Sequence, residues 1–142
     1  VDLVKQFEGF PRQGAPYLCP ANKWTRGYGF IRCLDGTRVT ASTPAISIEE
    51  AEEQLAHELS VFARGVDRCV TIPLNENQRG SLVSFTFNLG LGSLKASTLL
   101  KRVTEPDWDD VPNQFLRWVY AGGRKLRGLE LRREAEADLW LS

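Results

Sequence analysis

A single acidic residue, Glu8, ends a short apolar stripe and stands between Phe7 and Gly9 in VDLVKQFEGF. A carboxyl group held against aromatic side chains is desolvated, which favours the protonated form that a general acid needs. An ordinary solvated glutamate at the end of a helix would give the same pattern. The local sequence therefore leaves both interpretations of Glu8 open.

Other chemistries find little support. His57 is the only histidine and stands in the middle of QLAHELS, a helix-like stretch. Cys19, Cys33 and Cys69 are not in CxxC spacing, so we expect no metal site. A nucleophile-elbow pattern for a Ser-His-Asp triad is missing. The GYG and GLG segments lack the lysine and the full spacing of phosphate-binding loops, so we expect no cofactor.

Composition narrows the function classes. With 142 residues, 42% of them hydrophobic, the chain suits a single domain over residues 1–142 with a sizeable core. It carries 18 basic and 18 acidic residues, and this balance gives no reason to expect nucleic acid or a membrane surface as a partner. No apolar run approaches the roughly 20 residues that span a bilayer. Because the chain starts at Val1 and has no methionine, we expect it to be excised from a longer one.

The candidate residues must be positioned by a small β region and several helices. Apolar spacing predicts a helix over residues 2–9 that ends at Gly9, and an Asp35-Gly36 turn predicts a small antiparallel sheet over 24–40. Ser47 and Glu50 form a capping box that opens a helix to about residue 67.

A third helix follows Pro73, with Asn75 as its N-cap and Gln78 three residues on, and its sequence LVSFTFNLGLG is typical of a buried helix. Further helices are expected over 94–102, 107–120 and 128–141, the second of them ended by Gly122-Gly123. The expected fold class is α+β and mostly α, with a small β-hairpin lobe and a larger helical lobe.

Four sequence blocks carry a resemblance to a known family. They are FEGF, YLCPANKWTRGYGF, PLNENQRGSLVSFTFNLGLGSLKASTLLKRV and FLRWVYAGGRKLRGLELRREAEADLWL. In order and spacing they resemble the phage-type lysozymes, the endolysin family 24 of glycoside hydrolases, from about residue 3 to the end. The resemblance implies a lysozyme-like fold and a muramidase that hydrolyses the β-1,4 bond between N-acetylmuramic acid and N-acetylglucosamine in bacterial peptidoglycan.

The resemblance also implies a catalytic set. Glu8 matches the family's glutamate, Cys19 matches the second position, which is Asp or Cys, and Thr25 matches the threonine that opens T-x-G-x-G. By this resemblance Glu8 protonates the glycosidic oxygen and an attacking water is held by Cys19 and Thr25, which inverts the anomeric centre. A thiol is a poor general base unless its pKa is lowered, so the alternative for Cys19 is a small buried hydrophobic residue.

The sequence departs from the family pattern in two places. Two extra residues separate Glu8 from Cys19, within PRQGAP, where a loop can absorb them. Phe30 replaces the histidine of T-x-G-x-G-H, so we expect an apolar contact in place of an ion pair. Cys33 and Cys69 then form a possible disulfide between the two lobes, which would indicate an oxidising compartment, or else two separate thiols.

The resemblance places Phe87 and Asn88 at the substrate cleft, with Ser97 as a weaker match and Tyr28 beside the catalytic threonine. Asn88 offers a donor and an acceptor, which suits an N-acetyl group. For Phe87 and Tyr28, core packing is the alternative.

Near the C-terminus, a basic cluster has two interpretations: contact with anionic wall polymers, or a solvated helix face paired with nearby glutamates. We favour the solvated face. The cluster comprises Arg124, Lys125, Arg127, Arg132 and Arg133, with Glu130, Glu134 and Glu136 as the expected partners.

We therefore expect a monomeric peptidoglycan hydrolase that acts on the cell wall from the periplasm or from outside the cell, delivered by a segment outside this chain. The alternative is a catalytically weak or inactive lysozyme-like domain that binds peptidoglycan within a larger phage or secretion machine. A nucleic-acid-binding domain that uses the arginine-rich C-terminal helix is a third possibility, and the zero net charge argues against it.

Overall fold

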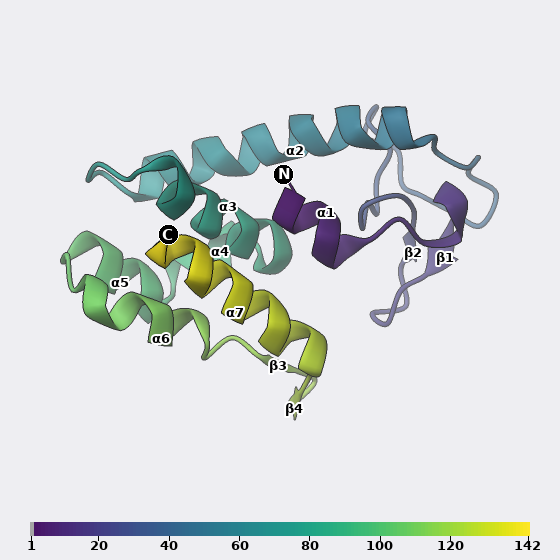
Figure 1. Cartoon of the computed structure of the whole chain (residues 1–142). Coiled ribbons are helices and arrows are strands. Elements are labelled where there is room, and N and C mark those ends of the chain that lie inside the picture. The colour runs from purple at the N-terminus through teal and green to yellow at the C-terminus, as the bar shows by residue number, and fades with distance from the viewer. Residues whose placement is uncertain (1) are drawn as a thin grey trace. The chain divides into compact units, whose positions relative to one another are not determined.

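The computed structural model describes residues 2–142, which divide into two compact units (Figure 1). The first unit ends at Glu58 and the second comprises Leu59–Ser142. Helix α2, Ile48–Cys69, continues from the first unit into the second. Most of the described residues are helical, and the strands form two small antiparallel pairs. The expected fold class, α+β and mostly helical, is therefore confirmed.

The first unit starts with helix α1, Asp2–Glu8, which ends where the sequence predicts because Gly9 takes a left-handed φ of 68°. A 3₁₀ turn, η1 (Pro11–Gly14), forms the first four residues of PRQGAP, the stretch in which two extra residues are expected. Strands β1 (Tyr17–Leu18) and β2 (Trp24–Thr25) follow and pair antiparallel.

The predicted position of the sheet, residues 24–40, was right only for β2, because its partner strand precedes this range. Its paired strands lie at β1 and β2, and the stretch from 26 to 40 forms only two isolated bridges, Arg26↔Phe30 and Arg32↔Arg38. Gly27 and Gly29 have φ angles of 60° and 80°, which interrupt an extended strand. The Asp35-Gly36 turn does form, as the second bridge encloses it.

The predicted capping box at Ser47 and the predicted N-cap at Asn75 are both present. The Ser47 hydroxyl accepts from the backbone N–H of Glu50, whose carboxylate accepts in return from the backbone N–H of Ser47, and these bonds precede α2. Asn75 and Gln78 make the same reciprocal pair at the start of α3, Glu76–Leu89. These bonds satisfy backbone donors that the first turn of a helix leaves without partners.

The second unit contains more and shorter helices than the sequence predicts. The helix expected over 94–102 is split into α4 (Leu91–Lys95) and α5 (Thr98–Thr104), because Ser97 caps a new helix start. The helix expected over 107–120 is a 3₁₀ turn, η2 (Trp108–Asp110), and a short α6 (Val111–Phe115).

Gly122 and Gly123 do not end a helix. They form the turn between strands β3 (Tyr120–Ala121) and β4 (Arg124–Lys125), where both have positive φ. The C-terminal helix α7, Arg127–Leu141, agrees with the prediction.

Helix α7 packs against α3 and α6 within the second unit (Figure 1). The core of this unit collects side chains from all three helices and from α2, α4 and α5; its fully buried members are Leu82, Phe85, Leu94, Leu99, Val103, Val111 and Phe115. In residues 2–142 no helix has the length and apolar content to cross a membrane.

Candidate active site

Glu8 is the last residue of α1, and its carboxylate lies against the backbone of Gly29 in the first unit. A Cβ atom built on Gly29 would come 2.5 Å from Glu8 Oε2, and the φ of Gly29 is 80°. Both the space and the backbone angle therefore require glycine here. The T-x-G-x-G segment and the acid at the helix end are thus neighbours in space.

The register of β1 and β2 brings three side chains to one face. Tyr17 is the Cα partner of Thr25, and residues directly opposite in an antiparallel pair share a face. Cys19 follows Tyr17 by two positions, and its backbone N–H donates to the carbonyl of Lys23 at 3.0 Å, which continues the pairing. The side-chain alternation of strands then places Cys19 on the face of Tyr17 and Thr25.

Thr25 is 3% exposed, and its hydroxyl donates to the Lys23 carbonyl at 3.0 Å. The Thr25 side chain also lowers the pKa of the Cys19 thiol, so the two side chains lie close together. The single hydroxyl hydrogen of Thr25 is used on the Lys23 carbonyl. The oxygen lone pairs of Thr25 can then accept a hydrogen bond from water.

The thiol of Cys19 has a pKa below its ordinary value. The largest cause is a hydrogen bond from the backbone of Lys23, which outweighs the opposing effect of burial; the Thr25 side chain also lowers the pKa. Hydrogen bonds to the thiolate favour the charged form of the group. Cys19 is also partly exposed, so it has the microenvironment of a reactive cysteine rather than that of a buried hydrophobic residue.

We did not select Tyr17 from the sequence, although the structure brings it to the same site. Its pKa is raised, first by burial and then by the negative charges of Glu8 and Cys19. Both groups therefore lie within electrostatic reach of the phenol. Its spacing of two from Cys19 was the signal that could have identified it, once a strand was recognised there.

In the second unit, Asn88 and Phe87 lie in the last turn of α3 and are partly exposed. Asn88 Oδ1 accepts a hydrogen bond from Arg133 Nη2 at 2.8 Å. The Phe87 ring packs edge-on against Phe62, with 5.7 Å between centroids. One side of Phe87 is thus used in packing, as the alternative interpretation expected.

Ser97 is 5% exposed, and its hydroxyl is occupied: it donates to the Leu94 carbonyl at 2.6 Å and accepts from the backbone of Leu100 at 3.0 Å. It nevertheless lines a pocket of about 310 Å³, together with Ala96, Thr98, Gln114, Arg117 and Trp118. Four of these side chains, Thr98, Gln114, Arg117 and Trp118, carry hydrogen-bonding groups.

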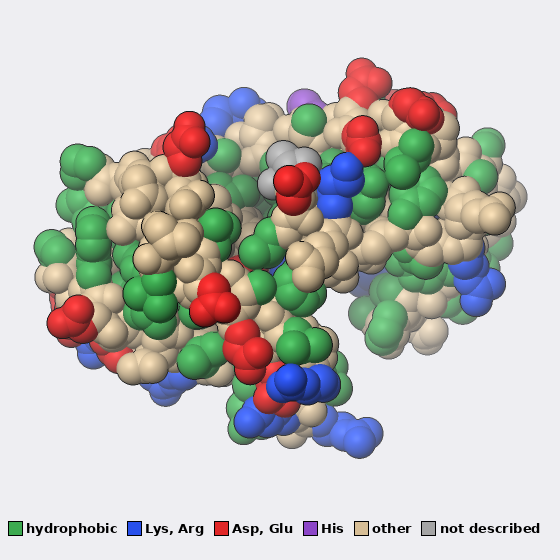
Figure 2. All heavy atoms as spheres, in the orientation of Figure 1, with side chains coloured by type: hydrophobic (Ala, Val, Ile, Leu, Met, Phe, Trp, Pro, Cys, Tyr) green, Lys and Arg blue, Asp and Glu red, His purple; other side chains and the backbone are tan. Residues whose placement is uncertain are grey.

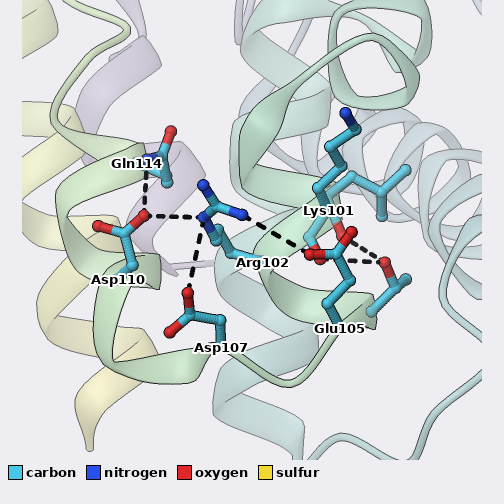
Figure 3. A network of polar contacts seen from close by, with 8 residues as sticks. Lys101, Arg102, Glu105, Asp107, Asp110 and Gln114 are labelled. Atoms are coloured by element: carbon cyan, nitrogen blue, oxygen red, sulfur yellow. Dashed lines mark hydrogen bonds and ion pairs between the residues drawn. The ribbon is translucent and has the colours of Figure 1, made fainter.

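A polar network holds this pocket's wall in place (Figure 3). Asp110 Oδ2 accepts from Gln114 Nε2 at 2.8 Å and from Arg102 Nε at 3.1 Å. The Gln114 carbonyl in turn accepts from Arg117 Nη1 at 3.4 Å. Arg102 also lies 3.6 Å from Glu105 and 3.8 Å from Asp107.

Tyr28 lies in the core of the first unit rather than on its surface. It is 3% exposed and makes edge-on contacts with the rings of Phe10 and Phe30, at 5.5 and 6.2 Å between centroids. Phe30 is 2% exposed, so the residue that replaces the family histidine makes apolar contacts. We therefore leave Tyr28 out of the proposed substrate-binding set.

The solvated-face interpretation of the C-terminal basic cluster was wrong for two of its members, because Arg132 and Arg133 are only 4% and 0% exposed. Their ion-pair partner Glu136 is buried as well. The interpretation holds for exposed Lys125 and Arg127. Basic and acidic side chains lie together where β4 leads into α7 (Figure 2).

Among residues 2–142, no group of three or more His, Cys, Asp or Glu side chains could hold a metal ion. All three cysteines are free thiols in this structure. Cys33 belongs to the first unit and Cys69 to the second. Their pairing stays a prediction, which the mass of the protein with and without reductant would decide.

The sequence and the structure of the chain are similar to those of phage lysozymes and endolysins. The Phage lysozyme family model matches residues 5–136. An endolysin of Bacillus phage B103 is 38% identical over the whole chain, which covers 52% of that endolysin. The chain thus spans about half the length of the Bacillus phage endolysins that it matches.

Solved structures with the same fold include an endolysin and a muramidase domain. An endolysin from Escherichia coli O157:H7 phage FAHEc1 is 32% identical with a TM-score of 0.88, over 99% of this chain and 89% of that one. The muramidase domain of SpmX from Asticaccaulis excentricus is 31% identical with a TM-score of 0.79, over 99% and 93% of the two chains. The chain belongs to the phage lysozyme family.

Proposed function

We propose that this chain is a peptidoglycan hydrolase, an N-acetylmuramidase that cleaves the β-1,4 bond between N-acetylmuramic acid and N-acetylglucosamine. The observation that carries the proposal lies in the first unit. There the Glu8 carboxylate abuts the T-x-G-x-G segment, and the side chain of Thr25, from the same segment, lies close enough to Cys19 to lower the pKa of its thiol. Membership of the phage lysozyme family supports the assignment.

In the proposed mechanism, Glu8 is the general acid. Its carboxyl group gives a proton to the glycosidic oxygen as the bond between that oxygen and the anomeric carbon breaks. The sugar then develops oxocarbenium character, and a water attacks the anomeric carbon from the opposite face. The product sugar has inverted configuration, and Glu8 is left as a carboxylate that regains its proton from solvent.

Cys19 and Thr25 act on the attacking water. Thr25 accepts one hydrogen of the water through an oxygen lone pair, and the Cys19 thiolate takes the proton that the water loses. The lowered pKa of Cys19 supports this role, because it raises the thiolate fraction near neutral pH. After attack Cys19 is a thiol, which returns its proton to solvent.

The second unit supplies glycan contacts in this proposal. Asn88 hydrogen-bonds an N-acetyl group, and the exposed side of Phe87 packs against a sugar ring. Ser97 contributes as part of the pocket wall rather than through its hydroxyl, which is already occupied by the capping of α5. The hydrogen-bonding groups of Gln114, Arg117 and Thr98 suit a polar portion of the peptidoglycan.

The proposed setting is the bacterial cell wall, reached from the periplasm or from outside the cell, with the chain acting as a monomer. A light-scattering mass in solution tests the oligomeric state.

Loss of turbidity of purified cell walls tests the activity, with Glu8→Gln as the main variant. Glutamine keeps the shape of the side chain but has no acidic proton, so we expect the variant to lose nearly all lysis while still sedimenting with the walls. Product anomers resolved by NMR test inversion. Wall binding without lysis by the wild type would instead support the inactive binding domain.

A further inference from the structure

A buried polar cluster in the second unit joins α3 to α7. Arg133 and Glu136 are both 0% exposed, and Arg133 Nε lies 2.7 Å from Glu136 Oε1. The Ser84 hydroxyl donates to Glu136 Oε2 at 2.5 Å, and Arg133 Nη2 donates to Asn88 Oδ1 at 2.8 Å. We call these four side chains, Ser84, Asn88, Arg133 and Glu136, the Asn88 anchor.

The anchor follows from helix spacing. Ser84 and Asn88 are four residues apart on α3, and Arg133 and Glu136 are three apart on α7, so each pair lies on one side of its helix. The two helices pack together, and each residue of one pair meets one residue of the other. The Arg133 guanidinium also lies over the Phe85 ring, 5.2 Å from its centroid, which limits its rotation.

This arrangement is energetically unfavourable unless every charge is compensated. Burial raises the pKa of Glu136 and lowers the pKa of Arg133, while each charge opposes the shift of the other. Replacing a buried ion pair with apolar groups is often neutral or stabilising, so stability alone does not account for it. Asn88 is the member of the anchor that is partly exposed.

The geometry points to a positioning role: we propose that Arg133, held by Glu136 and Ser84, fixes the orientation of the Asn88 amide so that its Nδ2 hydrogens face the substrate. An arginine only donates hydrogen bonds, so the Asn88 atom that faces it must be Oδ1. The opposite corner of the planar amide, Nδ2, then points away from Arg133. Asn88 therefore recognises an acceptor oxygen, such as the carbonyl of an N-acetyl group.

The inference rests on the proposed function for its substrate, and Asn88→Asp tests it most directly. Aspartate keeps an oxygen for Arg133 but has no hydrogens to donate. We expect unchanged or higher thermal stability and an increase of about tenfold in KM for solubilised peptidoglycan, the effect of one lost hydrogen bond. An unchanged KM would overturn the proposal. It would mean that Asn88 only accepts hydrogen bonds from the substrate, which aspartate does equally well.

The anchor itself is tested by the pair Arg133→Met and Glu136→Gln made together, which removes the Arg133–Glu136 ion pair as a whole. Arg132, which also pairs with Glu136, keeps its hydrogen bond to the Ser84 carbonyl in this variant. We expect the KM of this double variant to rise as much as that of Asn88→Ala, with no further rise when all three changes are combined. Additive rises would show that Arg133 affects KM independently of Asn88, and an unchanged KM of the double variant would show that it acts only on stability. The matched control is Arg79→Met with Asp67→Asn, which removes an exposed ion pair of the same unit and should leave KM unchanged.

Arg133→Lys separates charge from geometry. Lysine keeps the positive charge beside Glu136 but lacks the planar fork that contacts Glu136 and Asn88 together. We expect Arg133→Lys to have near wild-type stability and a KM as high as that of the double variant. A wild-type KM for Arg133→Lys would contradict positioning by the guanidinium.

Binding of Glu8→Gln protein to insoluble peptidoglycan, with and without Asn88→Asp, applies the test without catalysis. If the wild type lysed no walls while Asn88→Asp weakened this binding, the muramidase proposal would fail and the role of the Asn88 anchor would stand.

Discussion

The backbone of Gly29 lies directly against the Glu8 carboxylate. Any residue other than glycine at this position would place its Cβ atom in the space that the carboxylate fills. That Cβ would lie 2.5 Å from Glu8 Oε2, closer than unbonded atoms approach. Gly29 lies four residues after Thr25, so one short segment both supports the acid and carries the threonine. The spacing of T-x-G-x-G therefore has a steric reason in this protein.

Gly29→Ala should reduce wall lysis strongly and stability moderately. The new methyl group pushes the Glu8 carboxylate from its place, and displacement of a catalytic group by about 1 Å can reduce the rate about a hundredfold. The left-handed φ of 80° adds a cost of about 1 to 2 kcal/mol in stability. Turbidity assays and thermal denaturation measure the two effects separately.

Gly36→Ala is the matched control for this prediction. Gly36 has a similar φ of 91°, but a Cβ there would meet no atom within 4 Å. Both variants should therefore lose similar stability, and only Gly29→Ala should lose activity. Equal activities of the two variants would show that the contact with Glu8 has no catalytic consequence.

Activity should rise with pH as Cys19 becomes a thiolate. Its pKa is lowered, mainly by the backbone of Lys23, so the rise should be centred below the value of about 8.5 of a free cysteine. Cys19→Asp should move this rise to lower pH, since an ordinary aspartate has a pKa of about 3.9. Initial rates of wall lysis between pH 4 and about 9 at constant ionic strength measure the shift.

Cys19→Ser is the control for the thiolate, because a hydroxyl keeps the hydrogen-bonding capacity of the side chain but does not ionise in this range. It should leave only a small part of the activity, without the rise. If the wild type, Cys19→Asp and Cys19→Ser shared one pH profile, Cys19 would not be the base.

The network around Asp110 should stabilise the second unit at neutral pH and lose its effect in acid. The pKa of Asp110 is lowered by the Gln114 hydrogen bond and then by Arg102. A group with a lowered folded-state pKa contributes stability above its unfolded value, about 3.9, and loses it as the pH falls through the folded value. Asp110→Asn should therefore melt below the wild type at pH 7 and together with it well below pH 3.9.

Asp109→Asn removes the same charge from an exposed neighbour and should melt like the wild type at both pH values. Asp110→Asn should also raise KM, because Gln114 loses its support in the pocket wall (Figure 3). Arg117, which donates to Gln114, is then less well held. A melting difference that persisted in acid would show that the effect does not come from the Asp110 charge.

Local signals in the sequence predicted the features that local forces decide. Gly9 ends α1, and the boxes Ser47–Glu50 and Asn75–Gln78 open α2 and α3, because each depends on residues within one turn of helix. Strand pairing depends on distant partners. The strong turn signal at Asp35-Gly36 therefore misplaced the sheet, whose paired strands lie before it.

The buried charges could not be found from the sequence alone. On α7, Arg132, Arg133 and Glu136 stand beside other charged residues, in a pattern that a solvated helix also shows. Their burial results from α3, which supplies Ser84 and Asn88 as partners from about 50 residues away. Glu8, Cys19 and Thr25 were found through the family resemblance, since no single local pattern distinguished Glu8 from a surface glutamate.

The phenol of Tyr17 should report the charge of Glu8. Its pKa is raised by burial and then by the negative charges of Glu8 and Cys19. A negative neighbour disfavours a phenolate, so neutralising Glu8 in Glu8→Gln should lower the pKa of Tyr17. NMR of ¹³C-labelled tyrosine rings, followed from neutral to high pH, measures this shift. Tyr120 is 64% exposed and serves as the reference within each sample. If Tyr17 titrated identically in wild type and Glu8→Gln, the two groups would not share one site.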